Sequence, residues 1–540
     1  MSRRRMGPII PKVCGADVEL GNFVAGTERL GGTGPEASRA LLGAIVELTQ
    51  AVPALRNTAS SRFRRSAAVN AQDSGRVFLP TNGGCVYIDL DHLELCLPEV
   101  VSAFDHVAAW HAMLRLAQAG LTAANADRDP DRRVQAMVNN CDGRGNSYGG
   151  HLNIAMTRRA WDAVMRRKLH YLAYLASYQA SSLVFTGQGK TGSENDRPEV
   201  SYQISQRADF IETMLGPQTT FFRPLINTRD EPHSGEARLH LISFDSTLCP
   251  VASLLRVGVT QLVLTMIEAD RVNPRLALDD PLAAFQDWSC DPLLEHRAPL
   301  VNGKRVSAVE LQLRFLDEAR RFAEQVGFET VPRATEILDC WQETLDGLTR
   351  RDWPMLARRL DWVMKLAMLE RAKAQRPELA WDSPELRYLD QLFGALDPDS
   401  GLFWAWSRAG LVEAVVPDER IRHFEAEPPP DTRAWGRAML LRTGGPDTID
   451  QVDWSTIRFR PQSTRPACVV DMLHPLSATR EHWKDRFTAD ASLENVLAEL
   501  GAERVPNAQA TIVLPGPRGL VPGVWHSPVT QWKGDGDESA

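Results

Sequence analysis

Two short acidic segments constrain the fold of this chain more than any other part of its sequence. Residues 14–21 read Cys-Gly-Ala-Asp-Val-Glu-Leu-Gly, and residues 86–94 read Val-Tyr-Ile-Asp-Leu-Asp-His-Leu-Glu. Apolar and polar side chains alternate in both segments, which is the period of a β-strand. The period predicts two strands that each gather polar side chains on one face: Asp17 and Glu19 on the first, and Tyr87, Asp89 and Asp91 on the second.

Carboxylates that share one face of a sheet repel each other strongly unless a cation lies between them. Clusters of oxygen ligands suit Mg²⁺, which usually also binds the phosphates of a substrate. Each segment on its own is also compatible with the solvated face of an exposed strand. Because both segments are embedded in apolar residues, the two together favour a metal site.

The composition indicates an ordinary globular protein. At 540 residues, with 43% hydrophobic and 24% charged side chains, the chain is long enough for at least two domains. Its net charge of -8 gives no general electrostatic reason to bind nucleic acid or an anionic membrane, so neither is expected as a partner. There is no Cys-x-x-Cys pair, no secretory signal and no uninterrupted apolar run of membrane-spanning length, and a reduced cytoplasmic protein is expected.

Strand and helix patterns alternate along the first half of the chain. An Asn82-Gly83 turn lies between two strand-like runs and predicts a hairpin that leads into the second acidic segment. Helices are predicted at 35–52, 100–125, 157–182 and 251–267; a strand, a glycine-rich turn and a strand at 135–156; and further strands at 182–186, 200–205, 219–227 and 237–244. Residues 307–415 have mainly helical periodicity.

A proline-rich break divides the chain into two predicted domains. Residues 427–431 read Glu-Pro-Pro-Pro-Asp, which is typical of a boundary between folded segments. The larger domain comprises residues 1–427, including the helical part at 307–415. The smaller, mixed domain comprises residues 428–540, and its Gly/Pro-rich acidic end is expected to be a flexible tail.

Three further segments combine polar side chains with glycine or arginine. Residues 139–153 carry glycines, which let a backbone approach a ligand closely, although the same pattern also occurs in ordinary turns. Residues 226–240 crowd Arg, acidic and His residues, which can neutralise phosphoryl oxygens or form a surface ion-pair cluster. Residues 186–192 contain Gly-Lys-Thr but do not form a P-loop, because the glycine required five residues before Gly189 is Val184.

In their order along residues 13–460, these segments resemble the family of the Pup ligase and Dop, the deamidase and depupylase of the prokaryotic ubiquitin-like protein Pup. That family belongs to the glutamine synthetase-like carboxylate–amine ligases. The resemblance rests on many short matches in the same order: residues 15–21, 81–83, 87–89, 92–94, 139–140, 147–149, His151, Ser205-Gln206-Arg207-Ala208-Asp209, 226–233, Leu360-Asp361-Trp362, Lys365 and Asp431-Thr432-Arg433-Ala434.

The resemblance implies an α+β fold, in which a glutamine synthetase-like curved antiparallel sheet forms an ATP cradle packed with helices, beside a small C-terminal domain. ATP and Mg²⁺ are the implied cofactors, and Pup or another small ubiquitin-like modifier, with its conjugates, is the implied partner. By position, Asp89 matches the catalytic aspartate. The implied metal-side residues are Asp17, Glu19, Tyr87, Glu94, His151 and His240, and the implied nucleotide contacts are Arg207, Arg229, Arg433 and Trp454.

Three positions depart from the family pattern. Asp17 stands where the family has glutamate, Cys85 where it usually has an arginine that contacts ATP, and Leu152 where it usually has glutamate. The shorter Asp17 side chain reaches less far towards a metal. A protein that binds nucleotide or modifier without turnover therefore stays open as an alternative to an enzyme.

The spacing of the second acidic segment favours one of the two branches of the family. Glu94 lies five positions after Asp89, which resembles the Dop branch, whereas the ligase branch has one residue more. A Dop-like deamidase and isopeptidase is therefore the expected activity. The alternative is a ligase that forms an acyl phosphate on the modifier and transfers it to a lysine amine.

Overall fold

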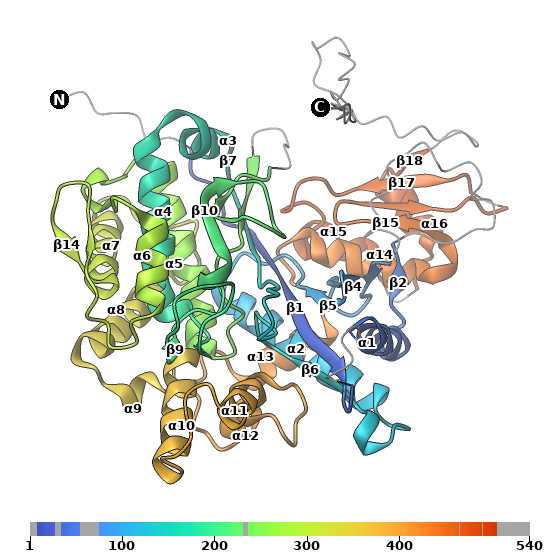
Figure 1. Cartoon of the computed structure of the whole chain (residues 1–540). Coiled ribbons are helices and arrows are strands. Elements are labelled where there is room, and N and C mark those ends of the chain that lie inside the picture. The colour runs from blue at the N-terminus through green and yellow to red at the C-terminus, as the bar shows by residue number, and fades with distance from the viewer. Residues whose placement is uncertain are drawn as a thin grey trace, which may run out of the picture.

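A central antiparallel sheet, helices around it and a smaller C-terminal sheet make up the protein in this computed structural model (Figure 1). The structure describes residues 8–27, 34–54, 75–230, 236–463, 465–488 and 490–504. The central sheet has eight strands in the order β12-β7-β1-β5-β4-β3-β2, and β6 pairs with the far end of β1. The strands are β1 (Cys14–Val24), β2 (Val52–Pro53), β3 (Val77–Phe78), β4 (Cys85–Asp89), β5 (His92–Cys96), β6 (Val134–Met137), β7 (Leu152–Thr157) and β12 (Glu236–Leu241).

The register of this sheet brings the two acidic segments together. β5 pairs with β1 on one side, where Glu94 lies opposite Glu19, and with β4 on the other side, where Glu94 lies opposite Tyr87. Residues directly opposite each other in an antiparallel pair point to the same face of the sheet. The polar face that the alternation predicts for each segment is therefore continuous across three strands.

The second acidic segment forms two strands, and the prediction of a single strand is wrong. β4 ends at Asp89 and β5 begins at His92, with Leu90 and Asp91 in the turn between them. Leu90 has a φ of +50°, a left-handed conformation that suits the first position of a two-residue hairpin turn. Asp91 is exposed in this turn, so it does not share a strand face with Tyr87 and Asp89 as predicted.

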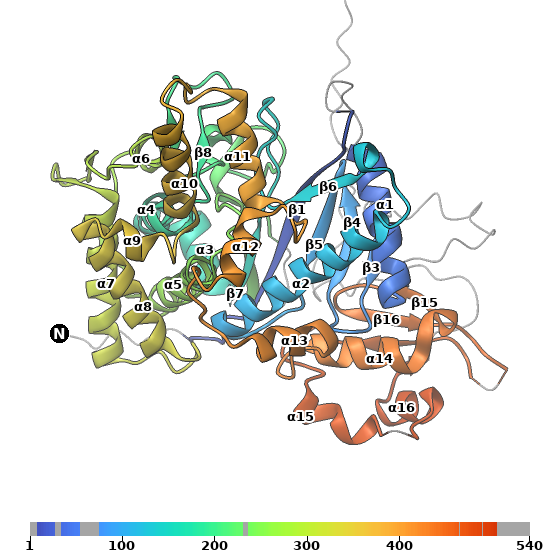
Figure 2. The same ribbon diagram turned by 90° about the horizontal axis from the view of Figure 1, so that it is seen from below.

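Most helices form one block beside the sheet. Figures 1 and 2 show α4 to α12 on one side of β1, and the C-terminal strands on the opposite side, next to β2 and β3. The helices are α1 (Gly34–Thr49), α2 (Ala103–Ala124), α3 (Arg158–Asp162), α4 (Leu169–Thr186), α5 (Pro250–Glu268), α6 (Pro281–Ser289), α7 (Ala308–Gln325), α8 (Ala334–Arg350), α9 (Trp353–Leu356), α10 (Asp361–Gln375), α11 (Pro384–Gly394), α12 (Leu402–Arg408) and α13 (Asp418–Ala426). Short strand pairs connect them: β8 (Lys190–Thr191) with β9 (Tyr202–Gln203), β10 (Ile211–Gly216) with β11 (Arg223–Asn227), and β13 (Ala298–Pro299) with β14 (Arg305–Val306).

The core of the helical block is α5. This helix is long and apolar enough to cross a membrane, but 94% of its apolar window is buried inside the protein, as in the core helix of a globular domain. Around it, α6, α7 and α9 begin at residues whose side chains cap the helix. Ser307 and Glu310, for example, form a complete capping box at the start of α7.

The helix predicted at 157–182 is interrupted at Lys168, where the backbone is extended, so it forms α3, a π-helical turn at residues 163–167 and α4. The other predicted elements agree with the structure except at two places. The hairpin at the Asn82-Gly83 turn, the glycine-rich turn between β6 and β7, and the helical part at 307–415 are confirmed. The strand predicted at 182–186 is wrong, because these buried residues are the last turn of α4, which ends at Thr186 with Gly187 as its C-cap. A short apolar run is compatible with either a buried strand or a buried helix, and here the preceding helix simply continues. The second exception is the turn at Leu90.

The C-terminal part has its own sheet and packs against the edge of the central one. It contains α14 (Arg433–Thr448), β15 (Ile449–Val452), β16 (Thr456–Phe459), β17 (Cys468–Asp471), α15 (Arg480–Trp483), α16 (Leu493–Glu499) and β18 (Glu503–Arg504). Its apolar residues, such as Leu440 and Phe459, form a cluster with Phe78, Cys85 and Tyr87 of the central sheet. The domain division at 428 stays a prediction, and the tail lies outside the described residues.

Candidate metal and nucleotide site

Three carboxylates from the two acidic segments meet on the polar face of the sheet. Glu19 of β1, Asp89 of β4 and Glu94 of β5 each place one carboxylate oxygen within 4.8 Å of the others. The pairing of β5 with both neighbours produces this group, because Glu94 lies opposite Glu19 and is diagonal to Asp89. Among the described residues, these are the acidic, His or Cys side chains that lie close enough together to hold one metal ion.

The environment of Glu94 shows what the group requires. Glu94 is almost completely buried, and burial raises the pKa of its carboxyl well above the usual range, with the charges of Asp17 and Glu19 adding to this. The Tyr87 hydroxyl and the Cys96 thiol, whose Sγ lies 3.3 Å from Glu94 Oε1, hydrogen-bond this carboxylate. The atoms of the group that can bind a metal are all oxygens, and a hard divalent cation would remove the repulsion among the carboxylates. This donor set fits Mg²⁺.

Asp17 lies beside this group and is engaged by a histidine. His151 Nδ1 is 2.8 Å from Asp17 Oδ1, and the His151 backbone N–H donates to the same oxygen at 3.2 Å. Burial alone would lower the pKa of His151, but the charge and hydrogen bond of Asp17 outweigh burial and raise it. The structure therefore places Asp17 between the carboxylate group and His151, and its role as a metal ligand stays a prediction.

His240 lies next to His151, and its pKa is changed in the opposite direction. The two rings are 5.2 Å apart, and His240 Nδ1 donates to Asn153 Oδ1 at 2.7 Å. Burial, together with the positive charge of His151, lowers the pKa of His240 well below its usual value. A neutral ring with its proton on Nδ1 keeps a lone pair on Nε2, which can accept a proton or bind a cation.

Arg207 supplies a buried positive charge near the acidic face. Its Nη1 donates to Tyr148 O at 2.6 Å and its Nε donates to Ile242 O at 3.1 Å, whereas its Nη2 has no hydrogen-bond partner among the described residues. Burial lowers the pKa of Arg207 to about 10, and the neighbouring charge of Arg223 contributes. A buried guanidinium with an unused donor is suited to an anionic ligand.

Two other predicted nucleotide contacts, Arg433 and Trp454, belong to the C-terminal part of the protein. Arg433 Nε donates to Glu99 Oε1 at 2.7 Å, and Trp454 packs edge-on against Phe78 with ring centroids 5.3 Å apart. Arg437, which the sequence analysis did not identify, connects them: it binds Glu99 and lies 4.8 Å from the Trp454 ring centroid. Arg229 is exposed after β11, and its charge contributes to the low pKa of His240.

Two further contacts to the acidic face come from outside the predicted residues. The Gly149 backbone N–H donates to Glu19 Oε2 at 2.7 Å, which the glycine-rich pattern of residues 139–153 could have indicated. Arg76 lies with its guanidinium 4.4 Å from the Tyr87 ring centroid. No pattern in the sequence marks Arg76, which comes just before the short strand β3.

A family model described as Pup-ligase protein matches residues 12–458. This chain belongs to the Pup-ligase family. The resemblance inferred from the motifs is thereby confirmed.

Curated relatives of this Pup-ligase family member carry both names of the family. A depupylase of Acidothermus cellulolyticus is 35% identical over 429 residues, covering 78% of this chain and 83% of that protein. A Pup deamidase/depupylase of Mycolicibacterium smegmatis is 34% identical, covering 77% and 81%. A Pup–protein ligase of Acidimicrobium ferrooxidans is also 34% identical, covering 76% and 89%.

Two solved structures share the fold. The ligase PafA in its complex with Pup matches with a TM-score of 0.73 and 26% identity, covering 91% of this chain and 92% of that chain. PafA in complex with ADP matches with a TM-score of 0.66 and 28% identity, covering 80% and 91%. The predicted α+β, glutamine synthetase-like fold is therefore confirmed.

Proposed function

We propose that this chain is an ATP- and Mg²⁺-dependent amidase and isopeptidase that acts at the C-terminal Gln or Glu of Pup or a Pup-like modifier. The Glu19–Asp89–Glu94 group carries this proposal, because it gathers three carboxylates at one point of the sheet. Two curated relatives, named depupylase and Pup deamidase/depupylase, support the same activity.

The three carboxylates have different roles in this proposal. Bound Mg²⁺ would neutralise the group and the phosphates of the nucleotide. Glu19 and Glu94, whose side chains come from paired strands, would hold the ion, with the Tyr87 hydroxyl fixing Glu94. Asp89 is the last residue of β4 and is only half-buried, next to the exposed Leu90–Asp91 turn, so a substrate can reach it.

The reaction follows from this placement of Asp89. An Asp89 oxygen attacks the amide carbonyl carbon of the modifier, or takes a proton from a water molecule that attacks it. The C–N bond breaks, and the nitrogen takes up a proton and leaves as ammonia from a C-terminal Gln, or as a lysine amine from a conjugate. Where an acyl-Asp89 forms, water adds to it and releases the C-terminal Glu carboxylate.

The nucleotide is proposed to lie on the basic side of the same face. Arg207 Nη2 is an unused donor among the described residues, and His240 and the exposed Arg229 lie near one another. These groups suit phosphate oxygens. The ADP complex of PafA supports nucleotide binding in this fold.

A Pup ligase is the second candidate. Two observations favour it: two solved relatives are the ligase PafA, and the Acidimicrobium ferrooxidans relative is named Pup–protein ligase. In that case the modifier's Glu carboxylate attacks the γ-phosphate of ATP and ADP leaves. Asp89 then takes a proton from the lysine amine that attacks the acyl phosphate, and phosphate leaves as the isopeptide bond forms. The two-residue turn between Asp89 and His92 supports the hydrolase instead, because it keeps the shorter Dop-like spacing.

The direction of the reaction is tested by supplying both kinds of substrate. Purified protein is incubated with Mg-ATP and either Pup ending in Gln, Pup ending in Glu with a lysine-bearing target, or a Pup conjugate. Release of ammonia and cleavage of the conjugate are expected. Conjugation without cleavage would overturn the hydrolase in favour of the ligase, and nucleotide binding without any turnover would overturn both.

The cell compartment and the domain division complete the proposal. All eight cysteines are free in the structure, which supports a reducing, cytoplasmic location. The proline-rich break before α14 supports a boundary near residue 428. Limited proteolysis that cuts first between residues 426 and 432 would support this boundary.

A further inference from the structure

The glycine-rich loop of residues 138–151 holds the carboxylates of β1 through its backbone. The Gly149 N–H binds Glu19 Oε2, so it determines which way the second oxygen of Glu19 faces the carboxylates of Asp89 and Glu94. Groups that orient metal-binding side chains typically change metal affinity by about 10- to 100-fold when they are removed. The position of Gly149 therefore matters for any cation bound to this group.

The loop does not have a stiff backbone of its own. Gly143 and Gly145 have φ values of +71° and +91°, which only glycine adopts readily, and residues 143–146 are exposed. Asp142 closes the loop on itself, since its Oδ1 accepts from the N–H groups of Arg144 and Asn146. The loop is also bonded to β1 directly, because the Glu19 N–H donates to Gly149 O at 3.0 Å, and further contacts from other segments fix its position.

Three charged side chains hold the loop along its length. Glu194 Oε1 accepts from the Gly145 N–H at 3.2 Å. Arg223 Nη2 then donates to Ser147 O, and Arg207 Nη1 to Tyr148 O, each at 2.6 Å. The next residue is Gly149, so a continuous tether runs from Glu194 to Glu19 along five residues of backbone.

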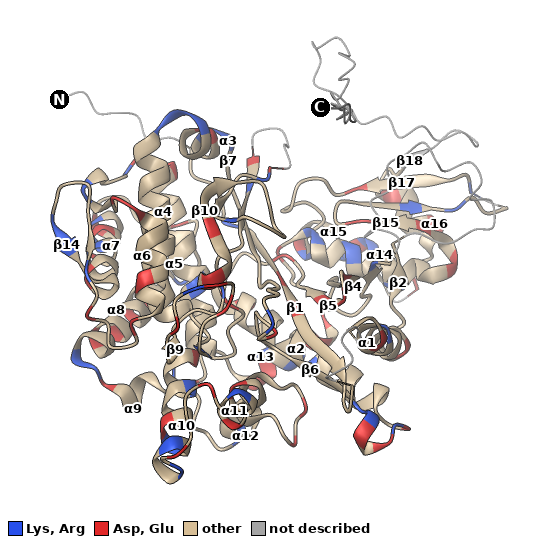
Figure 3. Ribbon diagram, viewed as in Figure 1, with Lys and Arg blue, Asp and Glu red and all other residues tan. Residues whose placement is uncertain are grey.

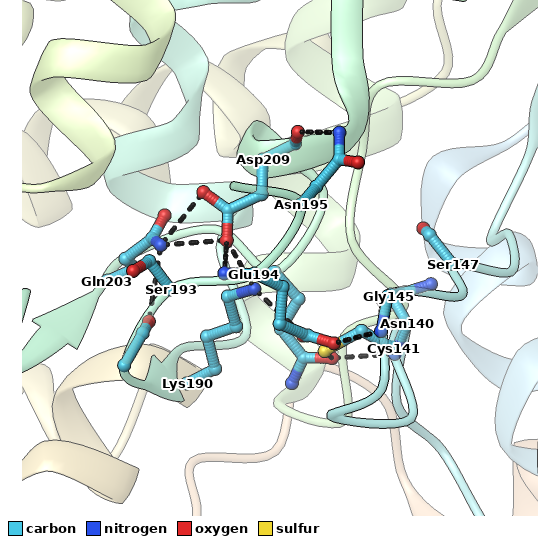
Figure 4. A network of polar contacts seen from close by, with 12 residues as sticks. Asn140, Cys141, Gly145, Ser147, Lys190, Ser193, Glu194, Asn195, Gln203 and Asp209 are labelled. Atoms are coloured by element: carbon cyan, nitrogen blue, oxygen red, sulfur yellow. Dashed lines mark hydrogen bonds and ion pairs between the residues drawn. The ribbon is translucent and has the colours of Figure 1, made fainter. Parts of the chain in front are cut away.

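Glu194 is itself fixed by a buried ionic network, which Figure 4 shows next to the loop. Lys190 Nζ lies 3.0 Å from Glu194 Oε2 and 2.6 Å from Asp209 Oδ2. Asp209 also accepts from the Glu194 backbone N–H at 2.7 Å and from Gln203 Nε2 at 2.9 Å. The network thus fixes both the backbone and the carboxylate of Glu194.

Burying these charges costs free energy that their pairing only offsets. The side chains of Lys190 and Asp209 are each 4% exposed, and that of Glu194 is 12% exposed. Lys190 binds Asp209 and Oε2 of Glu194, which leaves Oε1 of Glu194 for the loop. This division of contacts indicates that the network has a role besides packing.

We propose that Glu194 is a positioning residue for the metal site: it fixes the loop at Gly145, and the loop fixes Glu19. The inference rests on the proposed function only in treating Glu19 as a metal ligand. It also gives a role to the Gly-Lys-Thr segment that resembles a P-loop, because Lys190 holds Glu194.

The test is a titration with Mn²⁺ alone, followed by electron paramagnetic resonance, with no modifier present. Glu194→Ala is expected to raise the Kd for Mn²⁺ about tenfold. Glu194→Gln keeps an oxygen for the Gly145 N–H and is expected to stay within about threefold of the wild type. Glu199→Ala removes an exposed carboxylate five positions along and is the matched control, with an unchanged Kd.

Unchanged Mn²⁺ affinity in Glu194→Ala would overturn the proposal. So would equal losses in Glu194→Ala and Glu194→Gln, because the charge next to Lys190 and not the hold on the loop would then be responsible. If Glu194→Ala does not fold, Asp142→Ala loosens the same loop from its exposed side and must raise the Kd instead. Because Mn²⁺ binding is measured without substrate, a wild type that binds the ion but has no turnover would refute the proposed function and leave this inference standing.

Discussion

Glu99 joins the C-terminal helix α14 to the central sheet, and Glu99→Gln is expected to destabilise that junction. Arg437 Nη2 and Arg433 Nε bind its carboxylate at 2.5 and 2.7 Å, and Arg437 also donates to Gly83 O in the turn before β4. Burial disfavours the charged form of Glu99, but the two arginines outweigh burial and lower its pKa from 4.5 to about 2. That drop corresponds to about 3 kcal/mol of stability at neutral pH.

The pH dependence follows from the direction of this change. Because the pKa is lower in the folded state, the contribution of Glu99 is complete well above pH 4.5 and is lost as the pH falls towards 2. The variant has no such group. The difference in unfolding free energy between wild type and Glu99→Gln is therefore expected to be about 3 kcal/mol at pH 7 and about 1 kcal/mol smaller at pH 4.

Urea unfolding measured by circular dichroism at both pH values provides the assay. Glu427→Gln is the matched control. Glu427 forms an ion pair with Arg442, and because their side chains are 49% and 31% exposed, respectively, the pair is expected to contribute less than about 1 kcal/mol to stability. A loss below about 1 kcal/mol in Glu99→Gln at pH 7 would refute the reasoning. So would a difference that grows as the pH falls.

Two further predictions concern other buried charges. Glu94→Gln removes one of three crowded carboxylates, so the metal-free protein is expected to melt at a higher temperature, and its Kd for Mn²⁺ is expected to rise at least tenfold. Calorimetry and metal titration measure these two effects. A lower melting temperature would contradict the prediction. Lys12→Met leaves the fully buried Glu268 without its partner and is expected to cost about 3–5 kcal/mol in urea unfolding. Adding Glu268→Gln should restore part of that loss, and no recovery would argue against an uncompensated charge as the cause.

The alternation of the acidic segments was enough to predict β1, its polar face and the presence of a carboxylate cluster. It was not enough to locate the turn at Leu90–Asp91, because leucine is a rare residue at a positive φ and the segment lacks the Asn-Gly signal of the preceding hairpin. Pairing between strands, which alternation does not encode, decides that Glu94 joins Asp89 and Glu19. The family resemblance predicted Glu94 as a site residue, and the strand register explains why it lies beside Asp89 and Glu19.

Contacts between segments far apart in the chain could not be predicted from local patterns in the sequence. Glu99 and Arg437 are 338 positions apart, and neither lies in a pattern that marks it as charged and buried. Lys190 shows the reverse case. The spacing correctly excluded a P-loop, but only the folded chain shows that this lysine is neutralised by Asp209 and Glu194.

The rate at which a Pup conjugate is cleaved shows whether Asp89 is the reactive carboxylate of a Pup-directed hydrolase. Asp89→Asn is compared with Asp91→Asn, which removes an exposed carboxylate two positions along in the same hairpin. We expect a loss of about 10³-fold in Asp89→Asn and a rate within about threefold of the wild type in Asp91→Asn. Cleavage by Asp89→Asn at the wild-type rate would contradict it.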